Sequence, residues 1–255
     1  MSVTSFDYGF RVTKVTWRVE HLDQVDSTNS WLARRAGERA SEGDVVYANF
    51  QSAGRGRLSR EWVAPVGTSL LCSVLLEPGP LDGSPQMFVV AAALSMCEAL
   101  GRLSGVRPQL KWPNDILYGD DKVAGLLAEV VRTQIVVGLG LNLTAVDPAF
   151  ASATTVLEAT GVVLTPRDVL DAYLAALARR RELLDSSRGR VMLHEEFEAN
   201  LLTLGRTVRA QLSSEMVHGR AVGVDETGAL LIDTGSDVRV VSAGDVVHLR
   251  GEEQR

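Results

Sequence analysis

Residues 122–143 read KVAGLLAEVVRTQIVVGLGLNL, and this stretch decides the fold class of the chain. Two apolar runs, 122–132 and 135–143, lie on either side of a polar turn at Thr133 and Gln134. Apolar runs of strand length around a short turn predict an antiparallel hairpin. Because this part of the chain is rich in strands and poor in crossover connections, it favours a mixed α+β sheet over a doubly wound parallel sheet.

Segments on both sides of the hairpin extend this sheet. Residues 68–76, TSLLCSVLL, are apolar on both faces, which is typical of a central strand. Asp26 or Ser27 can cap a helix that starts near Thr28. Strands are expected at residues 17–26, 45–51, 68–76, 109–112 and 115–118, and helices from Thr28 and over 87–103, 168–184 and 190–201. The first 204 residues therefore predict one large α+β domain.

A smaller unit is expected from Gly205 to the end of the chain. Its short strands alternate with glycine-closed turns such as DETG at 225–228, a pattern that fits a β-barrel of about 50 residues. The predicted domains are therefore 1–204 and 205–255.

Composition limits the classes of function. The chain has 255 residues and a net charge of −6, so no overall basic field indicates nucleic acid. Cys72 and Cys97 lie in apolar runs, as buried thiols of a reducing compartment do, and no histidine stands at zinc-ligand spacing. We find no signal core and no run of about 18 apolar residues. A cytoplasmic protein without a membrane span is expected.

Residues 51–62, QSAGRGRLSREW, hold three arginines and two glycines, Gly54 and Gly56, in this acidic chain. Arg55, Arg57 and Arg60 repel one another and cannot all pack in a core. Glycine lets the backbone approach a ligand closely, and guanidinium groups converge on phosphate or carboxylate oxygens. The segment is either an anion-binding loop or a solvated basic turn.

Two further motifs carry charge at strand ends. In KWPNDI, residues 111–116, Asp115 could hold Mg²⁺ or orient a reacting oxygen, or it could simply form an Asx turn with Asn114. Lys122 enters an apolar strand and could neutralise a phosphate or carboxylate, or remain a surface lysine. Gly125 suggests close approach of a ligand or of another backbone.

Two weaker motifs remain. GLGLNL at 138–143 leaves room beside the sheet and supplies Asn142, but no helix follows it, so a Rossmann fingerprint is rejected. DSTN at 26–29 is explained by a helix cap alone.

In order and spacing, DSTN, QSAGRGRLSREW, KWPNDI, KVAGLLAEV and GLGLN resemble the signature of the biotin protein ligases. The resemblance covers roughly residues 20–204, and the C-terminal unit fits the family as well. It implies a class II synthetase-like catalytic domain, with a mixed, mainly antiparallel sheet and helices, followed by an SH3-like barrel.

The resemblance also implies a two-step reaction. The biotin carboxylate attacks the α-phosphate of ATP, giving biotinoyl-5′-AMP and pyrophosphate. A lysine of a biotin carboxyl carrier domain then attacks the mixed anhydride and releases AMP. Mg²⁺ is expected with ATP, but no protein ligands for it are assigned. Because both groups of the first step are anions, cations must screen their repulsion.

Site residues follow from the match to the motifs. The catalytic residues are expected to be Lys122, Asp115 and Arg57, with Asp115 orienting the acceptor lysine. Biotin is expected to contact Ser27, Thr28, Asn29, Gln51, Arg55, Gly56, Arg57, Lys122, Gly125 and Leu127. The nucleotide is expected to contact Arg55, Arg60, Trp62, Asn114, Lys122 and Asn142.

Two departures from the family pattern bear on these expectations. About twenty residues precede the catalytic region, too few for the helix-turn-helix that many members carry, so no DNA partner is expected. Ser59 stands where many members have a further glycine, which affects loop mobility.

A monomer or weak homodimer is expected. The alternatives are a lipoate-protein ligase and a non-catalytic module that binds a small ligand.

Overall fold

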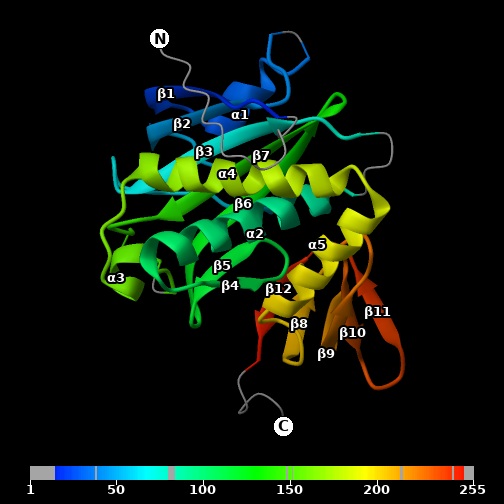
Figure 1. The fold of residues 1–255 in the computed structure, drawn as a ribbon. Helices are drawn as coiled ribbons and strands as arrows, with labels where there is room; N and C mark the ends of the chain where they lie inside the picture. Colours follow the sequence, from blue (N-terminus) through cyan, green and yellow to red (C-terminus); the bar gives the residue numbers. More distant parts are fainter. Residues whose placement is uncertain are drawn as a thin grey trace.

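The structure is a computed structural model that describes residues 15–37, 39–79, 84–147, 149–150, 152–212, 215–242 and 244–249. Figure 1 shows a layered α+β body with a smaller group of strands beneath it. The helices are α1 (Thr28–Ala33), α2 (Pro85–Ser104), α3 (Val156–Thr160), α4 (Pro166–Leu184) and α5 (Ser187–Asn200). The strands of the large body are β1 (Arg18–Val25), β2 (Asp44–Gln51), β3 (Ser69–Leu76), β4 (Gln109–Lys111), β5 (Asp115–Tyr118), β6 (Asp121–Val131) and β7 (Gln134–Asn142).

These seven strands form one sheet in the order β1-β2-β3-β7-β6-β5-β4. β1 and β2 pair in parallel, and the other neighbours pair antiparallel. The predicted mixed, mainly antiparallel sheet is confirmed. The predicted hairpin is also confirmed: β6 and β7 pair up to Val131 and Gln134, and Arg132 takes a φ of 57° in the turn.

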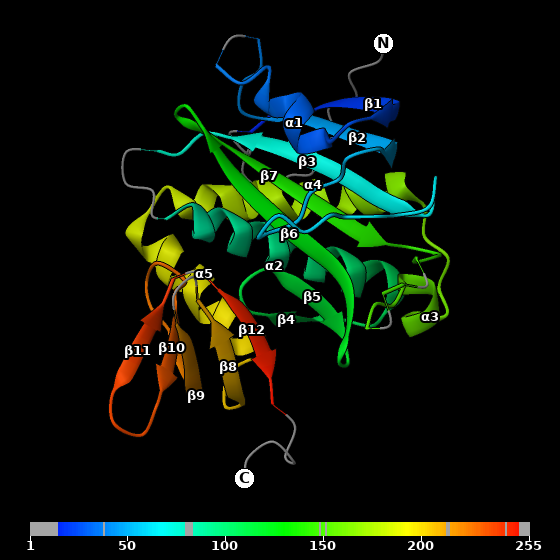
Figure 2. The same cartoon turned by 180° about the vertical axis from the view of Figure 1, so that it is seen from behind.

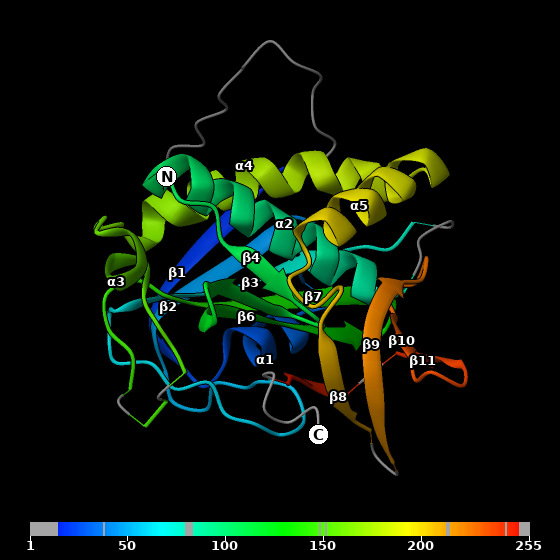
Figure 3. The same cartoon turned by 90° about the horizontal axis from the view of Figure 1, so that it is seen from below.

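One face of the sheet is covered by α2 and α4, which pack on each other (Figure 3): α2 lies on β5, β6 and β7, and α4 lies on β3. Ser84 caps α2, Pro85 starts it, and Gly105 ends it with a left-handed φ of 77°. Among the described helices, α2 alone is long and apolar enough to cross a membrane, but 72% of its most apolar part is buried. It is the central core helix of the large body.

The opposite face is covered only in part, by α1 (Figure 2). Leu32 and Ala36 pack there on Val46, Leu75 and Val136, which form a small second core. The rest of this face holds glycines where β6 and β7 pair, so that part of the sheet stays open to a ligand.

The C-terminal strands are β8 (Thr207–Gln211), β9 (Met216–Val224), β10 (Leu230–Asp233), β11 (Val238–Val241) and β12 (Asp245–His248). They form an antiparallel sheet in the order β11-β10-β9-β8-β12. The unit packs directly on the large body, where the Trp112 indole donates a hydrogen bond of 2.9 Å to the Gly228 carbonyl. Closure into an SH3-like barrel and the boundary at Leu204 stay predictions.

Both cysteines are buried and free, as predicted. Burial raises the pKa of the Cys72 and Cys97 thiols to about 12. They are therefore packing residues without thiolate chemistry.

Candidate active site

A cavity of about 750 Å³ opens on the sheet face that α1 leaves uncovered. Its walls are the Arg-Gly loop at 51–62, the ends of β5 and β6, the glycine-rich part of β7, and β12 of the C-terminal unit. Every site residue predicted from the sequence borders it: Ser27, Thr28, Asn29, Gln51, Arg55, Gly56, Arg57, Arg60, Trp62, Asn114, Asp115, Lys122, Gly125, Leu127 and Asn142. The structure thus brings together four segments that are distant in sequence.

Glycines make the floor of the cavity. Gly125 of β6 and Gly140 of β7 are paired residues in adjacent strands. A Cβ on Gly140 would lie 2.3 Å from Trp62 Cε2, and one on Gly125 would lie 3.3 Å from Trp62 Cζ3. The indole of Trp62 therefore rests on two glycine backbones. This explains in steric terms why β6 and β7 carry glycine here.

A bulge in β6 determines where Lys122 points. Ile116 pairs with Ala124, but the next residue of β5, Leu117, pairs with Lys122. The extra residue, Val123, joins Ala124 in the hydrophobic core. Because a bulge shifts the alternation of side chains by one, Lys122 lies on the same face as Gly125 and points into the cavity.

Lys122 and Asp115 form an ion pair, with 2.6 Å between Nζ and Oδ1. The Lys122 ammonium also lies 5.6 Å from the Trp62 ring. Beside this pair, Arg57 donates to Asn114 Oδ1 at 3.4 Å, and Asn114 donates to the Leu126 carbonyl. One end of the cavity therefore holds two cations and a half-buried carboxylate in contact.

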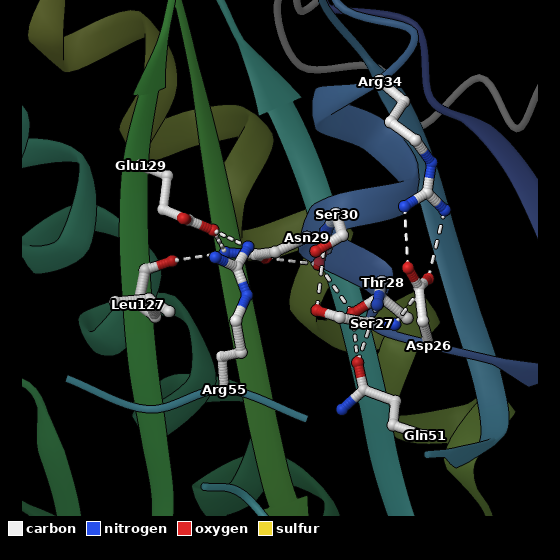
Figure 4. A network of polar contacts seen from close by, with 11 residues as sticks. Asp26, Ser27, Thr28, Asn29, Ser30, Arg34, Gln51, Arg55, Leu127 and Glu129 are labelled. Carbon is white, nitrogen blue, oxygen red and sulfur yellow. Dashed lines mark hydrogen bonds and ion pairs between the residues drawn. The ribbon is translucent and has the colours of Figure 1, made fainter. Parts of the chain in front are cut away.

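The other end is a polar network at the start of α1, in which uncharged groups lie between the ion pairs Arg34–Asp26 and Arg55–Glu129 (Figure 4). Gln51 Oε1 accepts hydrogen bonds from the backbone N–H of Thr28 at 2.7 Å and from its hydroxyl at 3.0 Å. Ser27 caps α1 through Ser30. Hydrogen bonds from Arg34 and from the Ser27 backbone hold the pKa of Asp26 at about 2, so Asp26 braces the turn as a carboxylate.

Two residues of this network were missed by the sequence interpretation. Ser73 of β3 is fully buried, and its hydroxyl lies 2.6 Å from Asn29 Oδ1 and 2.7 Å from Thr28 Oγ1. Glu129 of β6 binds both Arg55 and Asn29. Each is a polar residue inside an apolar run, a signal that marks the residue as unusual but does not identify its partners.

The Arg-Gly loop is itself a small hairpin. Gly56 N–H donates to the Arg60 carbonyl at 2.7 Å, and Trp62 N–H donates to the Gly54 carbonyl at 3.0 Å. At its tip Leu58 and Ser59 have φ of 53° and 59°, a left-handed pair typical of a type I′ turn. Ser59 thus occupies a position where glycine is less strained. The serine that replaces the glycine expected at this residue therefore lies within the turn at the tip of the loop.

Comparison with known proteins accounts for these shared motifs. Residues 22–142 match the biotin/lipoate A/B protein ligase family, and residues 203–249 match the biotin protein ligase C terminal domain. A biotin–[acetyl-CoA-carboxylase] ligase of Mycobacterium tuberculosis is 36% identical over 92% of this chain and 90% of its own length. The chain belongs to the biotin protein ligase family. A second ligase of the same name, from Paracoccus denitrificans, is 34% identical over 88% of this chain and 98% of its own.

The fold agrees with this family. The biotin protein ligase of Aquifex aeolicus, solved in complex with biotin and ATP, superposes with a TM-score of 0.81 at 28% identity. That match covers 91% of this chain and 99% of the other. The biotin protein ligase fold therefore extends over both the large body and the C-terminal strands.

Carboxylates that could bind a metal are few. Among the described residues, no group of three or more His, Cys, Asp or Glu side chains is placed to hold a metal ion. Asp115 and Asp120 both border the cavity. Mg²⁺ commonly uses one or two carboxylates together with substrate phosphates and water, so this donor set fits an ion that enters with a nucleotide.

Proposed function

We propose that the protein is an ATP-dependent ligase that forms biotinoyl-5′-AMP from biotin and ATP, and then transfers biotin to a lysine of a biotin carboxyl carrier domain. The observation that carries this proposal is the polarity of the cavity. At one end, uncharged donors and acceptors around Thr28 and Gln51 lie beside the mutually neutralising pair Arg55–Glu129, and at the other end lies Lys122 with Arg57. This arrangement suits a ligand with an uncharged polar head and a carboxylate tail.

The head of biotin is a cyclic urea, which offers N–H donors and a carbonyl acceptor. Ser27, Thr28, Asn29 and Gln51 are assigned to it. Leu127 and Gly125 lie along β6 between this network and Lys122, a span of roughly 15 Å at the rise of a β-strand. The apolar ring and chain of biotin then lie on the sheet floor, and the carboxylate lies beside the Lys122 ammonium.

In the first step a carboxylate oxygen of biotin attacks the α-phosphorus of ATP, and pyrophosphate leaves. Two anions approach each other, so their repulsion is the main electrostatic barrier. Lys122 is assigned to the biotin carboxylate and an α-phosphate oxygen, and Arg57 and Arg60 to the phosphates. The contact with the nucleotide predicted for Arg55 is not assigned, because its guanidinium lies on Glu129 at the other end of the cavity. Asp115 or Asp120 would hold a Mg²⁺ ion bound with ATP, and that ion would supply positive charge to the departing pyrophosphate.

The adenine is assigned to Trp62, whose flat indole lies against Gly125 and Gly140. Asn114 and Asn142 are assigned to polar contacts with the nucleotide. Asn142 is buried and donates to the Thr154 carbonyl at 3.2 Å, so its amide is fixed before a nucleotide binds. The C-terminal unit contributes Val246 and Val247 to the same cavity.

In the second step the acceptor lysine must lose a proton before its nitrogen attacks the acyl carbon and AMP leaves. Asp115 is assigned to orient that amine and accept its proton. Its contact with the Lys122 ammonium at 2.6 Å supports this role, because Lys122 is the residue assigned to the biotin carboxylate.

The proposal also covers the cellular setting and the partners. Two buried thiols fit a reducing cytoplasm. The net charge is negative, so the protein has no overall positive potential that would attract DNA. We infer a monomer or weak homodimer whose macromolecular partner is the carrier domain of an acyl-CoA carboxylase.

Pyrophosphate release with biotin, and separately with lipoate, tests the proposal. We expect ATP-dependent release with biotin alone, followed by labelling of a purified biotin carboxyl carrier domain. Release with lipoate alone would identify a lipoate ligase. No release with either acid would leave only a binding module.

A further inference from the structure

Glu129 joins the loop and the sheet through a single oxygen. Its Oε2 accepts a hydrogen bond from Arg55 Nη2 at 2.6 Å and another from Asn29 Nδ2 at 2.8 Å (Figure 4). Arg55 belongs to the Arg-Gly loop, Asn29 to α1, and Glu129 to β6. Three separate elements of the cavity wall therefore meet at one carboxylate.

The contacts of Asn29 fix the orientation of its amide. Asn29 is 4% exposed, and Nδ2 faces two acceptors, Glu129 Oε2 and the Leu127 carbonyl. Oδ1 faces the Ser73 hydroxyl. A Cβ on Gly138 would lie 2.2 Å from Asn29 Oδ1, so the amide lies flat on the sheet. Both N–H groups of Nδ2 donate to acceptors within the protein. Asn29 can therefore bind a ligand only through Oδ1, as a hydrogen-bond acceptor.

Glu129 also restrains the Arg-Gly loop through its ion pair with Arg55. Arg55 is bridged to Glu61 across the loop hairpin, and Gly54 beside it is held by the Trp62 backbone. An ion pair that holds the Arg55 side chain against β6 therefore restrains the base of the hairpin and the segment that carries Trp62. The pair is partly exposed, with Arg55 and Glu129 side chains 44% and 28% accessible, so its strength responds to salt.

We propose that Glu129 is a positioning residue for biotin adenylation, which fixes the Asn29 amide for the head of biotin and holds the Arg-Gly loop over the adenylate through Arg55. This inference rests on the proposed function. Glu129 itself does not touch the reacting atoms. The contacts of Glu129 with Asn29 and with Arg55 can be tested separately. An uncharged oxygen at position 129 would still accept the hydrogen bond from Asn29, but it would not form an ion pair with Arg55.

The test compares Glu129→Ala with Glu129→Gln in two measurements. The first measurement compares the change that each substitution causes in the KM for biotin with the change that it causes in the KM for ATP. The second is the rate at which biotinoyl-AMP is lost to water when no acceptor is present. Glu129→Ala should raise the biotin KM about tenfold, as expected for a lost hydrogen bond to a charged acceptor, and leave the ATP KM unchanged. It should also speed loss of the adenylate about fivefold, the upper end for a partly exposed ion pair.

Glu129→Gln should separate the two effects. Its amide oxygen still accepts from Asn29, so the biotin KM should stay within about twofold of the wild-type value. Loss of the adenylate should remain fast, because the ion pair is gone. Added salt should speed that loss in the wild type and leave it unchanged in Glu129→Gln.

Arg167→Ala is the matched control, since it removes an exposed ion pair with Asp171 on α4, away from α1 and the loop. It should change neither measurement. The proposal is overturned if Glu129→Ala behaves like Arg167→Ala, or if it lowers activity with both substrates in parallel with its melting temperature. Absence of biotinoyl-AMP from the wild type would instead reject the proposed function.

Discussion

Lys122 and Gly125 lie on one face of β6, so near that a Cβ on Gly125 would be 3.0 Å from both Nζ and Cε of the lysine. The bulge at Val123 produces this relationship, because uninterrupted alternation would place the two residues on opposite faces. The position of the Lys122 ammonium therefore depends on a glycine that carries no functional group.

Gly125→Ala should displace Lys122 without unfolding the protein. The added methyl meets the flexible end of a lysine side chain, so the free energy of unfolding should change by less than about 1 kcal/mol. Misplacing the ammonium should lower kcat/KM for adenylation by about tenfold to a hundredfold. Pyrophosphate release and urea unfolding measure the two quantities. Gly101→Ala, far from the cavity in α2, is the control and should leave adenylation unchanged.

Lys122→Ala should lower the rate of adenylate formation on the order of a hundredfold or more, because it removes charge stabilisation from the first step. Its thermal stability should stay near that of the wild type, since the side chain is partly exposed. Arg167→Ala, which removes a surface cation from α4, serves as the comparison. Biotinoyl-AMP formed at the wild-type rate by Lys122→Ala would contradict the role assigned to this lysine.

Asp115→Asn should slow transfer to the carrier domain more than it slows adenylation. Asparagine keeps an oxygen beside Lys122 and so keeps the lysine in place, but it accepts no proton from the acceptor amine. Single-turnover transfer from preformed biotinoyl-AMP isolates the second step. Equal losses in the two steps would argue against proton acceptance by Asp115.

His248 should make stability fall on the acid side of neutrality. Burial, with help from Lys111 and Arg206 and against the opposing charge of Asp120, lowers its pKa to about 4 from 6.5. Below pH 6.5 His248 binds a proton in the unfolded chain but stays neutral in the folded protein. Neutral His248 therefore contributes its full share to the free energy of unfolding above about pH 6.5, and this share is lost as the pH falls towards 4.

Urea unfolding at pH 7.5 and pH 5 checks this expectation. His248→Gln removes the titration and keeps a polar partner for the Thr203 hydroxyl, which lies 3.1 Å from His248 Nε2. The variant should lose less stability than the wild type between the two pH values. Equal losses would show that His248 does not carry the effect.

The Arg-Gly loop should gain protection from hydrogen exchange when biotin or its adenylate binds. Its tip is loosely packed, with Leu58 64% exposed, and its hairpin rests on a few backbone hydrogen bonds. We expect amide exchange across residues 54–60 to slow by about tenfold or more, while α2 stays unchanged. Strong protection of the loop before ligand is added would count against a lid.

Local patterns were sufficient to predict most of the fold. The apolar period of α2, the capping of α1 by Ser27 and the hairpin of β6 and β7 all depend on neighbouring residues, and each was confirmed. The same holds for β3, whose continuous apolar run placed it correctly at the centre of the sheet.

What the sequence could not predict depends on pairing between distant residues. Nothing near Val123 marks the bulge, which appears only when β6 is registered against β5. Glu129 resembled a solvated residue until Arg55 and Asn29, 74 and 100 positions away, were found beside it. Trp112 was known only as part of a motif, because its hydrogen-bond partner Gly228 lies 116 residues further along the chain.

That last contact means that the chain cannot be shortened at its predicted domain boundary. Trp112 is 1% exposed, and its indole is covered by the turn that includes Gly228. The continuous hydrophobic core includes Val208, Ala221 and Leu230 from the C-terminal strands. A chain cut after Leu204 would present this indole and the core side chains to water, and it should self-associate rather than survive as an independent adenylating fragment.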